Sequence, residues 1–205
     1  ALYLGLGKAA LGSGANTKSY HTLFRITLPE GPKTSPTGEL IADANAQIKK
    51  IVLKFRCNAI YSGSANPDIA AFAPMIRPIS AIDYDAMTWL TYDGTNAWVA
   101  DGDFGEGDRD TSSDFGSGVD GVIAKVVLPA AGWVDVVLQN KEITGPSQAK
   151  QLGLDWGQTV DILMFVHGTS SFTTSNNYSQ VFNLSMTAAS RPYLEVHYED
   201  DKPTK

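Results

Sequence analysis

A strict alternation of apolar and polar residues constrains this chain more than any other feature. In the segment IKKIVLKFRCNAIY, residues 48–61, every second residue from Ile51 to Tyr61 is apolar, whereas Lys50, Lys54, Arg56 and Asn58 occupy the alternate positions. Successive side chains of a β-strand point to opposite faces of a sheet. The segment is therefore predicted to be a strand with one buried and one solvated face.

The same period of two recurs along the chain. It predicts further strands in residues 20–29, 121–129, 132–139, 179–186 and 191–199. Residues 160–168, VDILMFVHG, are almost continuously apolar, which is typical of a strand covered on both faces. Residues 69–82 are also apolar, but Pro74 and Pro78 lack a backbone N–H, so we expect an edge or bent strand there.

These patterns predict an all-β protein: a jelly-roll β-sandwich in a single domain with at most one short helix, near Ser147 to Leu152. Hydrophobic residues make up 43% of the chain, which is enough for a substantial core. No internal repeat or second core is apparent. The expected division is an N-terminal strand or arm over residues 1–19, the jelly-roll β-sandwich over 20–199, and a charged C-terminal tail over 200–205.

Charge and composition exclude several classes of partner. The formal net charge is −6 and the sequence pI is about 5.0, and no cluster of basic residues stands out, so we expect no nucleic-acid binding. The longest apolar runs are far shorter than the roughly 20 residues of a transmembrane helix, so no membrane association is expected. Cys57 is the only cysteine, which excludes an internal disulfide framework and a cysteine zinc site.

The N-terminal segment has two interpretations. Leu2, Leu4 and Leu6 alternate with Tyr3 and Gly5, as in a short strand, and residues rich in Gly, Ala and Ser follow. The segment is either the first strand of the sandwich or an arm that adds a strand to a neighbouring subunit. In the second case Leu2, Tyr3, Leu4 and Leu6 would form subunit contacts.

Residues 101–120 are acidic and rich in glycine, and we expect them to form a loop. Asp101, Asp103, Asp108 and Asp110 could supply oxygen ligands to calcium, although the spacing DGDFGEGDRD is not that of an EF-hand. A solvated connection that carries no ligand is the alternative. A pair of catalytic carboxylates is a third reading, but glycosidases hold such groups on a rigid frame.

The aromatic residues offer a second candidate site. Among the tryptophans, Trp89 and Trp133 lie in or beside predicted strands, and we expect them to pack in the core. Trp98 and Trp156 lie beside loops, where they could contact a glycan or a protein partner. Tyr92 and Tyr178 could join them.

No catalytic motif is present, and we expect a non-enzymatic protein. His21, His167 and His197 lack the spacing of a metal site, and neither GTSSF nor SGSAN matches the G-x-S-x-G context of a serine nucleophile. The glycine-rich start, LGLGKAALGSG, does not follow a strand and open a helix as a dinucleotide-binding loop would. No cofactor is expected to be required, and calcium is the one candidate.

The order of the segments carries a family resemblance. Its parts are Phe24 to Pro29, Ile51 to Arg56, Thr88 with Trp89, Tyr92 to Trp98, Trp133 to Val136, and Arg191 to Tyr198. In this order they resemble the DNRLRE-domain family, whose members look like jelly-roll sandwiches related to carbohydrate-binding modules. The family often opens with an additional "DTYI" strand, which these residues do not contain.

The resemblance implies a function. Such domains occur in bacterial cell-surface proteins and in tailed-phage virion proteins, and YDGTNAW followed by an acidic loop is more similar to the phage branch. The expected function is a structural virion protein on the capsid surface, in its most concrete form a capsid decoration or cement protein that stabilises the shell. Its partners would be further copies of itself and the major capsid protein. The alternative is a carbohydrate-binding or adhesion module on a virion, an extracellular surface or a cell surface, with surface glycans as ligands.

Overall fold

The computed structural model describes residues 3–10, 17–20, 22–31, 46–61, 69–75, 81–88, 90–98, 122–129, 131–142, 152–166, 177–183 and 191–199. These ranges contain ten strands and no α-helix. The strands are β1 (Tyr3–Ala10), β2 (Thr17–Tyr20), β3 (Thr22–Thr27), β4 (Gln47–Tyr61), β5 (Ile69–Pro74), β6 (Ala124–Val127), β7 (Gly132–Asn140), β8 (Thr159–Val166), β9 (Asn177–Asn183) and β10 (Tyr193–Glu199). A search of the same ranges finds no helix of the length and hydrophobicity needed to cross a membrane.

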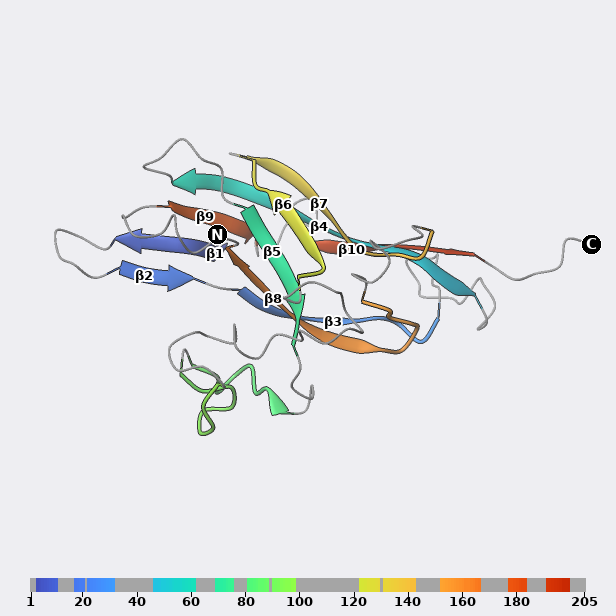
Figure 1. The fold of residues 1–205 in the computed structure, drawn as a ribbon, viewed down its shortest axis with the longest axis horizontal. Coiled ribbons are helices and arrows are strands. Elements are labelled where there is room, and N and C mark those ends of the chain that lie inside the picture. The colour runs from blue at the N-terminus through green and yellow to red at the C-terminus, as the bar shows by residue number, and fades with distance from the viewer. Residues whose placement is uncertain are drawn as a thin grey trace, which may run out of the picture.

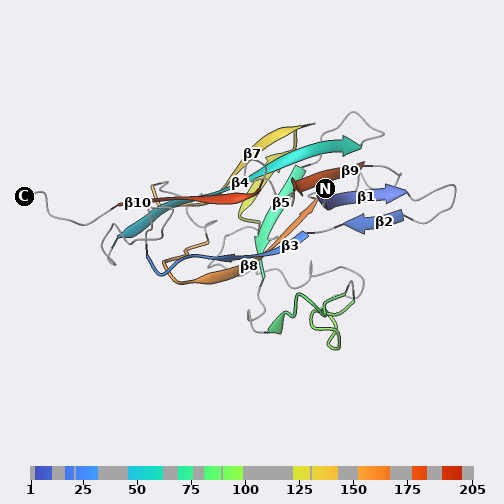
Figure 2. The same ribbon diagram turned by 180° about the vertical axis from the view of Figure 1, so that it is seen from behind.

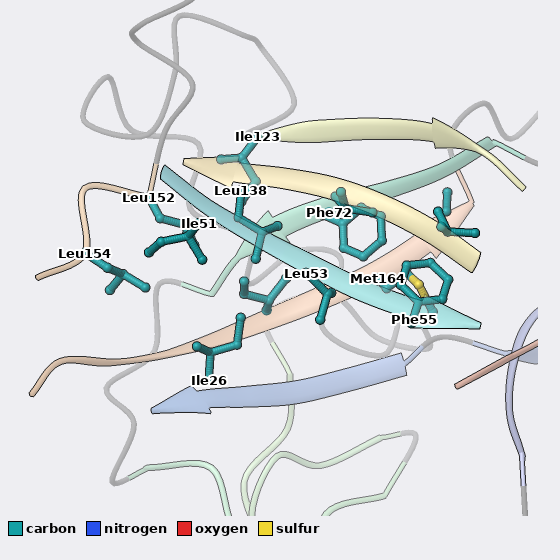
Figure 3. Close-up of a cluster of buried hydrophobic side chains, with 14 of the residues drawn as sticks. Ile26, Ile51, Leu53, Phe55, Phe72, Ile123, Leu138, Leu152, Leu154 and Met164 are labelled. Carbon is teal, nitrogen blue, oxygen red and sulfur yellow. The ribbon is translucent and has the colours of Figure 1, made fainter. Parts of the chain in front are cut away.

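The strands form two antiparallel sheets that face each other (Figure 1). Sheet A follows the order β10-β4-β9-β1-β2, and β7 pairs with β4 as its sixth strand. Sheet B follows the order β3-β8-β5-β6. Apolar side chains of both sheets fill the space between them (Figure 3), and the rings of Phe55 and Phe72 meet across it with centroids 6.2 Å apart. The predicted all-β class is confirmed, and the arrangement is that of a β-sandwich.

Strand β4 is the centre of sheet A, and its pattern of burial is the predicted one. Ile51, Leu53, Phe55 and Cys57 are buried, whereas Lys54 is half-buried and Arg56 is exposed. Cys57 pairs with Gly132 of β7 and also with Val181 of β9, so these two strands lie on opposite edges of β4. Strand β10 pairs with residues 47–54 of β4, and β7 pairs with the overlapping residues 50–57, so β7 and β10 also lie on opposite edges. Strands β10 and β9 therefore share one edge of β4, where they follow each other end to end.

Sheet B has a covered outer face as well as a covered inner face. Ile162 and Met164 of β8 point into the core between the sheets, while Leu163 and Phe165 pack in a second cluster with Ile82 and Trp98. The segment 81–98 supplies this cover and forms a third layer on the far side of sheet B from sheet A (Figure 2). The prediction that residues 160–168 are covered on both faces is confirmed for Ile162 to Phe165.

Of the edge or bent strand predicted for residues 69–82, the edge position is wrong for β5 (Ile69–Pro74), which lies inside sheet B between β8 and β6; Pro78 lies outside the described residues. The backbone N–H of Met75 donates to Asp161 O of β8, so the nitrogen of Pro74 faces the opposite edge. The ladder with β6 runs only from Ile69 to Phe72 and has ended before Pro74. The missing N–H therefore interrupts no hydrogen bond.

The N-terminal strand pairs within its own chain. Strand β1 lies between β9 and β2, with Leu4 opposite Val181 and Leu6 opposite Ser179 on one edge and Gly7 opposite Tyr20 on the other. One edge is thus paired with β9 from Tyr3 to Lys8, and the other is paired with β2 from Gly7 to Ala10. In this arrangement the segment is a strand of sheet A.

Candidate functional site

Sheet B is covered on both sides, whereas strands β4, β7 and β10 of sheet A carry exposed side chains on the face that points away from the core. Alternation along β7 sends Val134, Val136 and Leu138 into the core and the residues between them outward. The outward residues include large exposed apolar side chains: Trp133 is 45% exposed and Val137 is 41% exposed, and Tyr193 of β10 is 50% exposed. We call this surface the open face of sheet A and define it by Lys54, Arg56, Trp133, Asp135, Val137, Tyr193 and Glu195.

Two aromatic rings meet at one end of the open face. Trp133 pairs with Arg56, and Tyr193 pairs with Lys54, so the two rings come from the strands on either side of β4. The rings lean toward each other over β4 and touch edge to face, with centroids 5.7 Å apart and an interplanar angle of 64°. Each ring holds the other in place, and exposed aromatic groups that are held in this way are typical of binding surfaces.

An ion-pair network lies beside the rings. Lys54 Nζ is 2.9 Å from Glu195 Oε2 and 3.3 Å from Asp135 Oδ2, and His197 Nε2 is 2.6 Å from Glu195 Oε1. The hydrogen bond to Glu195, with help from Asp135, raises the pKa of Lys54. The hydrogen bonds from Lys54 and His197 lower the pKa of Glu195. Glu195 is therefore held in its charged form, and Lys54 contacts both carboxylates beside the exposed rings.

The structure reverses the predicted roles of two tryptophans. Trp98, expected at the surface, is only 3% exposed and packs against sheet B, with its Nε1–H donated to Thr88 O at 3.1 Å. Trp133, expected in the core, is exposed on the open face. Trp98 is buried because the segment 81–98 folds over the outer face of sheet B, so its ring is not available to a ligand. Trp89 lies outside the described residues.

Two other aromatic candidates, Tyr92 and Trp156, lie apart from the open face. Tyr92 is half-buried against the ring of Trp98, with centroids 5.8 Å apart. Trp156 is half-buried, donates its Nε1–H to Ala46 O at 2.6 Å and packs edge to face on Tyr198. Tyr178 is placed in β9 opposite Gly7 and Tyr61, and its side chain lies outside the described residues. The structure does not bring Tyr92, Trp98 and Trp156 together in one site.

A charged network attaches the third layer to sheet B. Asp161 of β8 is buried and accepts hydrogen bonds from Arg25 Nε at 2.8 Å, from a terminal nitrogen of Arg25 at 2.9 Å, and from the Tyr84 hydroxyl at 2.8 Å. The guanidinium carbon of Arg25 lies 4.8 Å from the centre of the Tyr84 ring. Burial, together with the bond to Asp161, raises the pKa of Tyr84. These groups are mutually satisfied, and their arrangement is structural.

The remaining predicted site residues either lie outside the described residues or have only their backbone described. Asp101, Asp103, Asp108 and Asp110, the candidate calcium ligands, lie outside the described ranges, as does Leu2. Tyr3, Leu4 and Leu6 are placed in β1 by their backbone pairing alone. Across the ranges that the structure does describe, no three His, Cys, Asp or Glu side chains gather closely enough to hold a metal ion.

Sequence reasoning missed the open face and the Arg25–Asp161–Tyr84 network, although both left signals. Trp133, Asp135 and Val137 share the face of their strand that is opposite Val134, Val136 and Leu138. Asp161 is the one charged residue in the apolar run VDILMFV, and a charge in a buried strand needs a partner. The partners, however, are 136 and 77 residues away along the chain, and no local pattern indicates them.

Comparison with known proteins adds no relative to these observations. No family model matches the chain, and no curated protein and no solved structure matches it significantly. The geometry of the open face of sheet A is therefore the basis for a functional proposal.

Proposed function

We propose that this chain is a non-enzymatic β-sandwich module that works by binding, and that the open face of sheet A is its contact surface. The observation that carries the proposal is the Trp133–Tyr193 pair, two exposed rings fixed on ordered strands beside a charged network. Exposed rings leave apolar area in water, and a partner that covers them gains that area as binding free energy. We further propose that the connections between the strands follow a jelly roll.

The resemblance to DNRLRE domains supports a particular setting for the module. In that setting the chain is a structural protein of a tailed-phage virion, a capsid decoration or cement protein bound to the major capsid protein and to copies of itself. A stiff two-sheet scaffold with one open face fits such a role, because the covered sheet provides rigidity and the open sheet provides contact area.

A carbohydrate-binding or adhesion module is the second candidate, and a specific observation favours it. Asp135 and Glu195 lie on the same face as the Trp133–Tyr193 pair and are both held by Lys54. A sugar has an apolar C–H face that stacks on an aromatic ring and hydroxyl groups that donate to carboxylates. The open face offers both kinds of group within one surface.

The virion setting is tested on native particles from the source of the chain. Particles are separated on a density gradient, and the chain is quantified in each fraction by mass spectrometry. Co-migration with the major capsid protein at a fixed, high ratio is expected. Absence from particle fractions, with the chain recovered from soluble or cell-surface material, would contradict the virion setting.

The contact surface is tested with variants of the full chain. Trp133→Ala should lose binding to particles or to the cell surface, whichever fraction holds the chain, while its circular dichroism and melting temperature stay close to those of the wild type. Leu90→Ala is the matched control, because Leu90 is 61% exposed and belongs to the third layer. Equal loss of binding in both variants, or in neither, would contradict the assignment of the open face.

A further inference from the structure

Charge is distributed unevenly over the open face of sheet A. Lys54 is compensated twice, by Asp135 and by Glu195. Arg56, two residues further along β4, is exposed and forms no ion pair with any residue in the ranges that the structure describes. It is paired in register with Trp133, so an uncompensated guanidinium lies next to an exposed indole. On a chain with a net charge of −6, such a group is a local anchor for an anion.

We propose that the open face binds an acidic glycan, a polysaccharide whose sugars carry carboxylate groups. This inference rests on the second candidate of the proposed function, a carbohydrate-binding module, and names the ligand of the same surface. The planar guanidinium of Arg56 matches a sugar carboxylate with two parallel hydrogen bonds. The C–H face of the sugar stacks on Trp133, with Tyr193 fixing the indole from the side. Hydroxyl groups of the glycan donate to Glu195 and Asp135, which Lys54 already holds in position.

The mixture of groups favours a glycan over a protein surface. The exposed apolar side chains of the open face, Trp133, Tyr193 and Val137, flank the ion-pair network of Lys54. A protein partner that sealed this surface would bury the network, and desolvation of its charges would offset much of the gain from covering the rings. A polysaccharide leaves water around the charged groups and needs only one ring face and one anion anchor.

Affinity electrophoresis of the full chain tests the proposal. Gels contain polygalacturonate, hyaluronate or alginate, and the matched neutral probe is fully methyl-esterified polygalacturonate, which has the same backbone without the charge. We expect at least one acidic polysaccharide to retard the wild-type chain and the methyl ester to have little effect. Arg56→Gln and Trp133→Ala should each weaken binding about tenfold, the equivalent of one lost charge-assisted contact or one lost stacking partner.

Two controls separate this site from general charge effects. Lys141→Gln removes a positive charge beyond the far end of β7, and Leu90→Ala removes an exposed apolar group from the third layer; both should bind as the wild type does. Equal retardation by the methyl ester, or equal weakening by Lys141→Gln and Arg56→Gln, would overturn the proposal. So would the absence of retardation by all three acidic polysaccharides.

The same variants distinguish a failure of the acidic-glycan inference from a failure of the open face as a contact surface. If no acidic polysaccharide binds but Trp133→Ala still loses attachment to particles or cells, the open face is a contact surface and the acidic-glycan inference is wrong. If Trp133→Ala changes neither polysaccharide binding nor attachment to particles or cells, both the inference and the proposed function fail. A dimer of the wild type that Trp133→Ala dissociates in sedimentation would assign the face to self-association and overturn the inference.

Discussion

Asp161 is a charged side chain inside the protein, and its partners determine whether it stabilises the fold. Arg25 binds both of its oxygens, and Tyr84 donates a hydrogen bond to one of them. Asp161→Asn keeps the shape but removes the charge, and we expect it to lower the free energy of unfolding by about 3 kcal/mol, because the guanidinium loses its counter-charge. Urea-induced unfolding followed by circular dichroism measures this change.

Tyr84→Phe is the control for this prediction. It removes one hydrogen bond to a charged acceptor and leaves the ion pair intact, so the expected loss is about 1.5 kcal/mol. A larger loss for Tyr84→Phe than for Asp161→Asn would mean that the hydroxyl, and not the ion pair, is the main attachment of the third layer.

Glu195 gives a prediction about pH. Its pKa in the folded state is lowered from the ordinary value of 4.5, first by the hydrogen bond from Lys54 and then by the one from His197. A lowered pKa means that the stabilising contribution is fully present above pH 4.5 and is lost as the pH falls through the folded-state value. A carboxyl titration by NMR should place Glu195 below 4.5, and Lys54→Met should move it upward. A wild-type titration at or above 4.5 would contradict the network.

At the scale of elements, a β-bulge in β7 determines how the strand meets the following segment. Ile51 pairs with Gln139 and Val52 pairs with Val137, so Leu138 is an extra residue in the ladder. The bulge accompanies a buried Gln139 side chain, which donates to Leu154 O at 3.1 Å and accepts from Leu154 N at 2.7 Å. The side chain thus completes the backbone hydrogen bonding of a segment that is not itself in a strand.

Gln139→Leu should lower the free energy of unfolding by about 2–4 kcal/mol, because it leaves the N–H and C=O of Leu154 buried without partners. Hydrogen exchange of the Leu154 amide should become faster than that of neighbouring strand amides. Val137→Leu, on the exposed side of the same bulge, should change stability by less than about 0.5 kcal/mol. Unchanged exchange at Leu154 would contradict this role of the Gln139 side chain.

The strands could be predicted from the sequence because burial of one face imposes the period of two on each of them. The alternation in β4 and the continuous apolar run in β8 correspond to observed burial, and Leu194 and Val196 of β10 pack against the core as their alternation predicts. The misjudged position of β5 shows the limit of a local rule. Pro74 does remove a donor, but which edge that donor would face, and where the neighbouring strand ends, depend on pairing with distant residues.

The candidate site was less predictable for a related reason. Alternation shows which residues share a face, but not which face another part of the chain covers. Trp98 is buried because its own segment folds onto sheet B, and Trp133 is exposed because none of the described segments packs over it. Both outcomes depend on the assembly of three layers, and a pattern within one strand does not contain that information.

At the scale of the whole molecule, sheet B contributes to both hydrophobic clusters, the one between the two sheets and the one beneath the third layer. Alternate residues of β8 pack on sheet A and on the third layer, so loss of either layer exposes one face of the same strand. We expect the Trp98 indole N–H, which is bonded to Thr88 O, to exchange with the same free energy of opening as the backbone amides of β8. Native-state hydrogen exchange measures both. A much lower value for Trp98 would show that the third layer opens by itself.

The central position of β4 has a consequence for synthesis on the ribosome. Its three partners all follow it in the chain: residues 62–131 separate β4 from β7, and β9 and β10 come later still. During translation the longest strand of sheet A therefore emerges with Ile51, Leu53 and Phe55 uncovered and both edges unpaired. Such a nascent strand is a template for wrong pairing with neighbouring chains. Correct assembly of sheet A must wait until residues 193–199 have left the exit tunnel, and until then the nascent chain is a natural client for a holding chaperone.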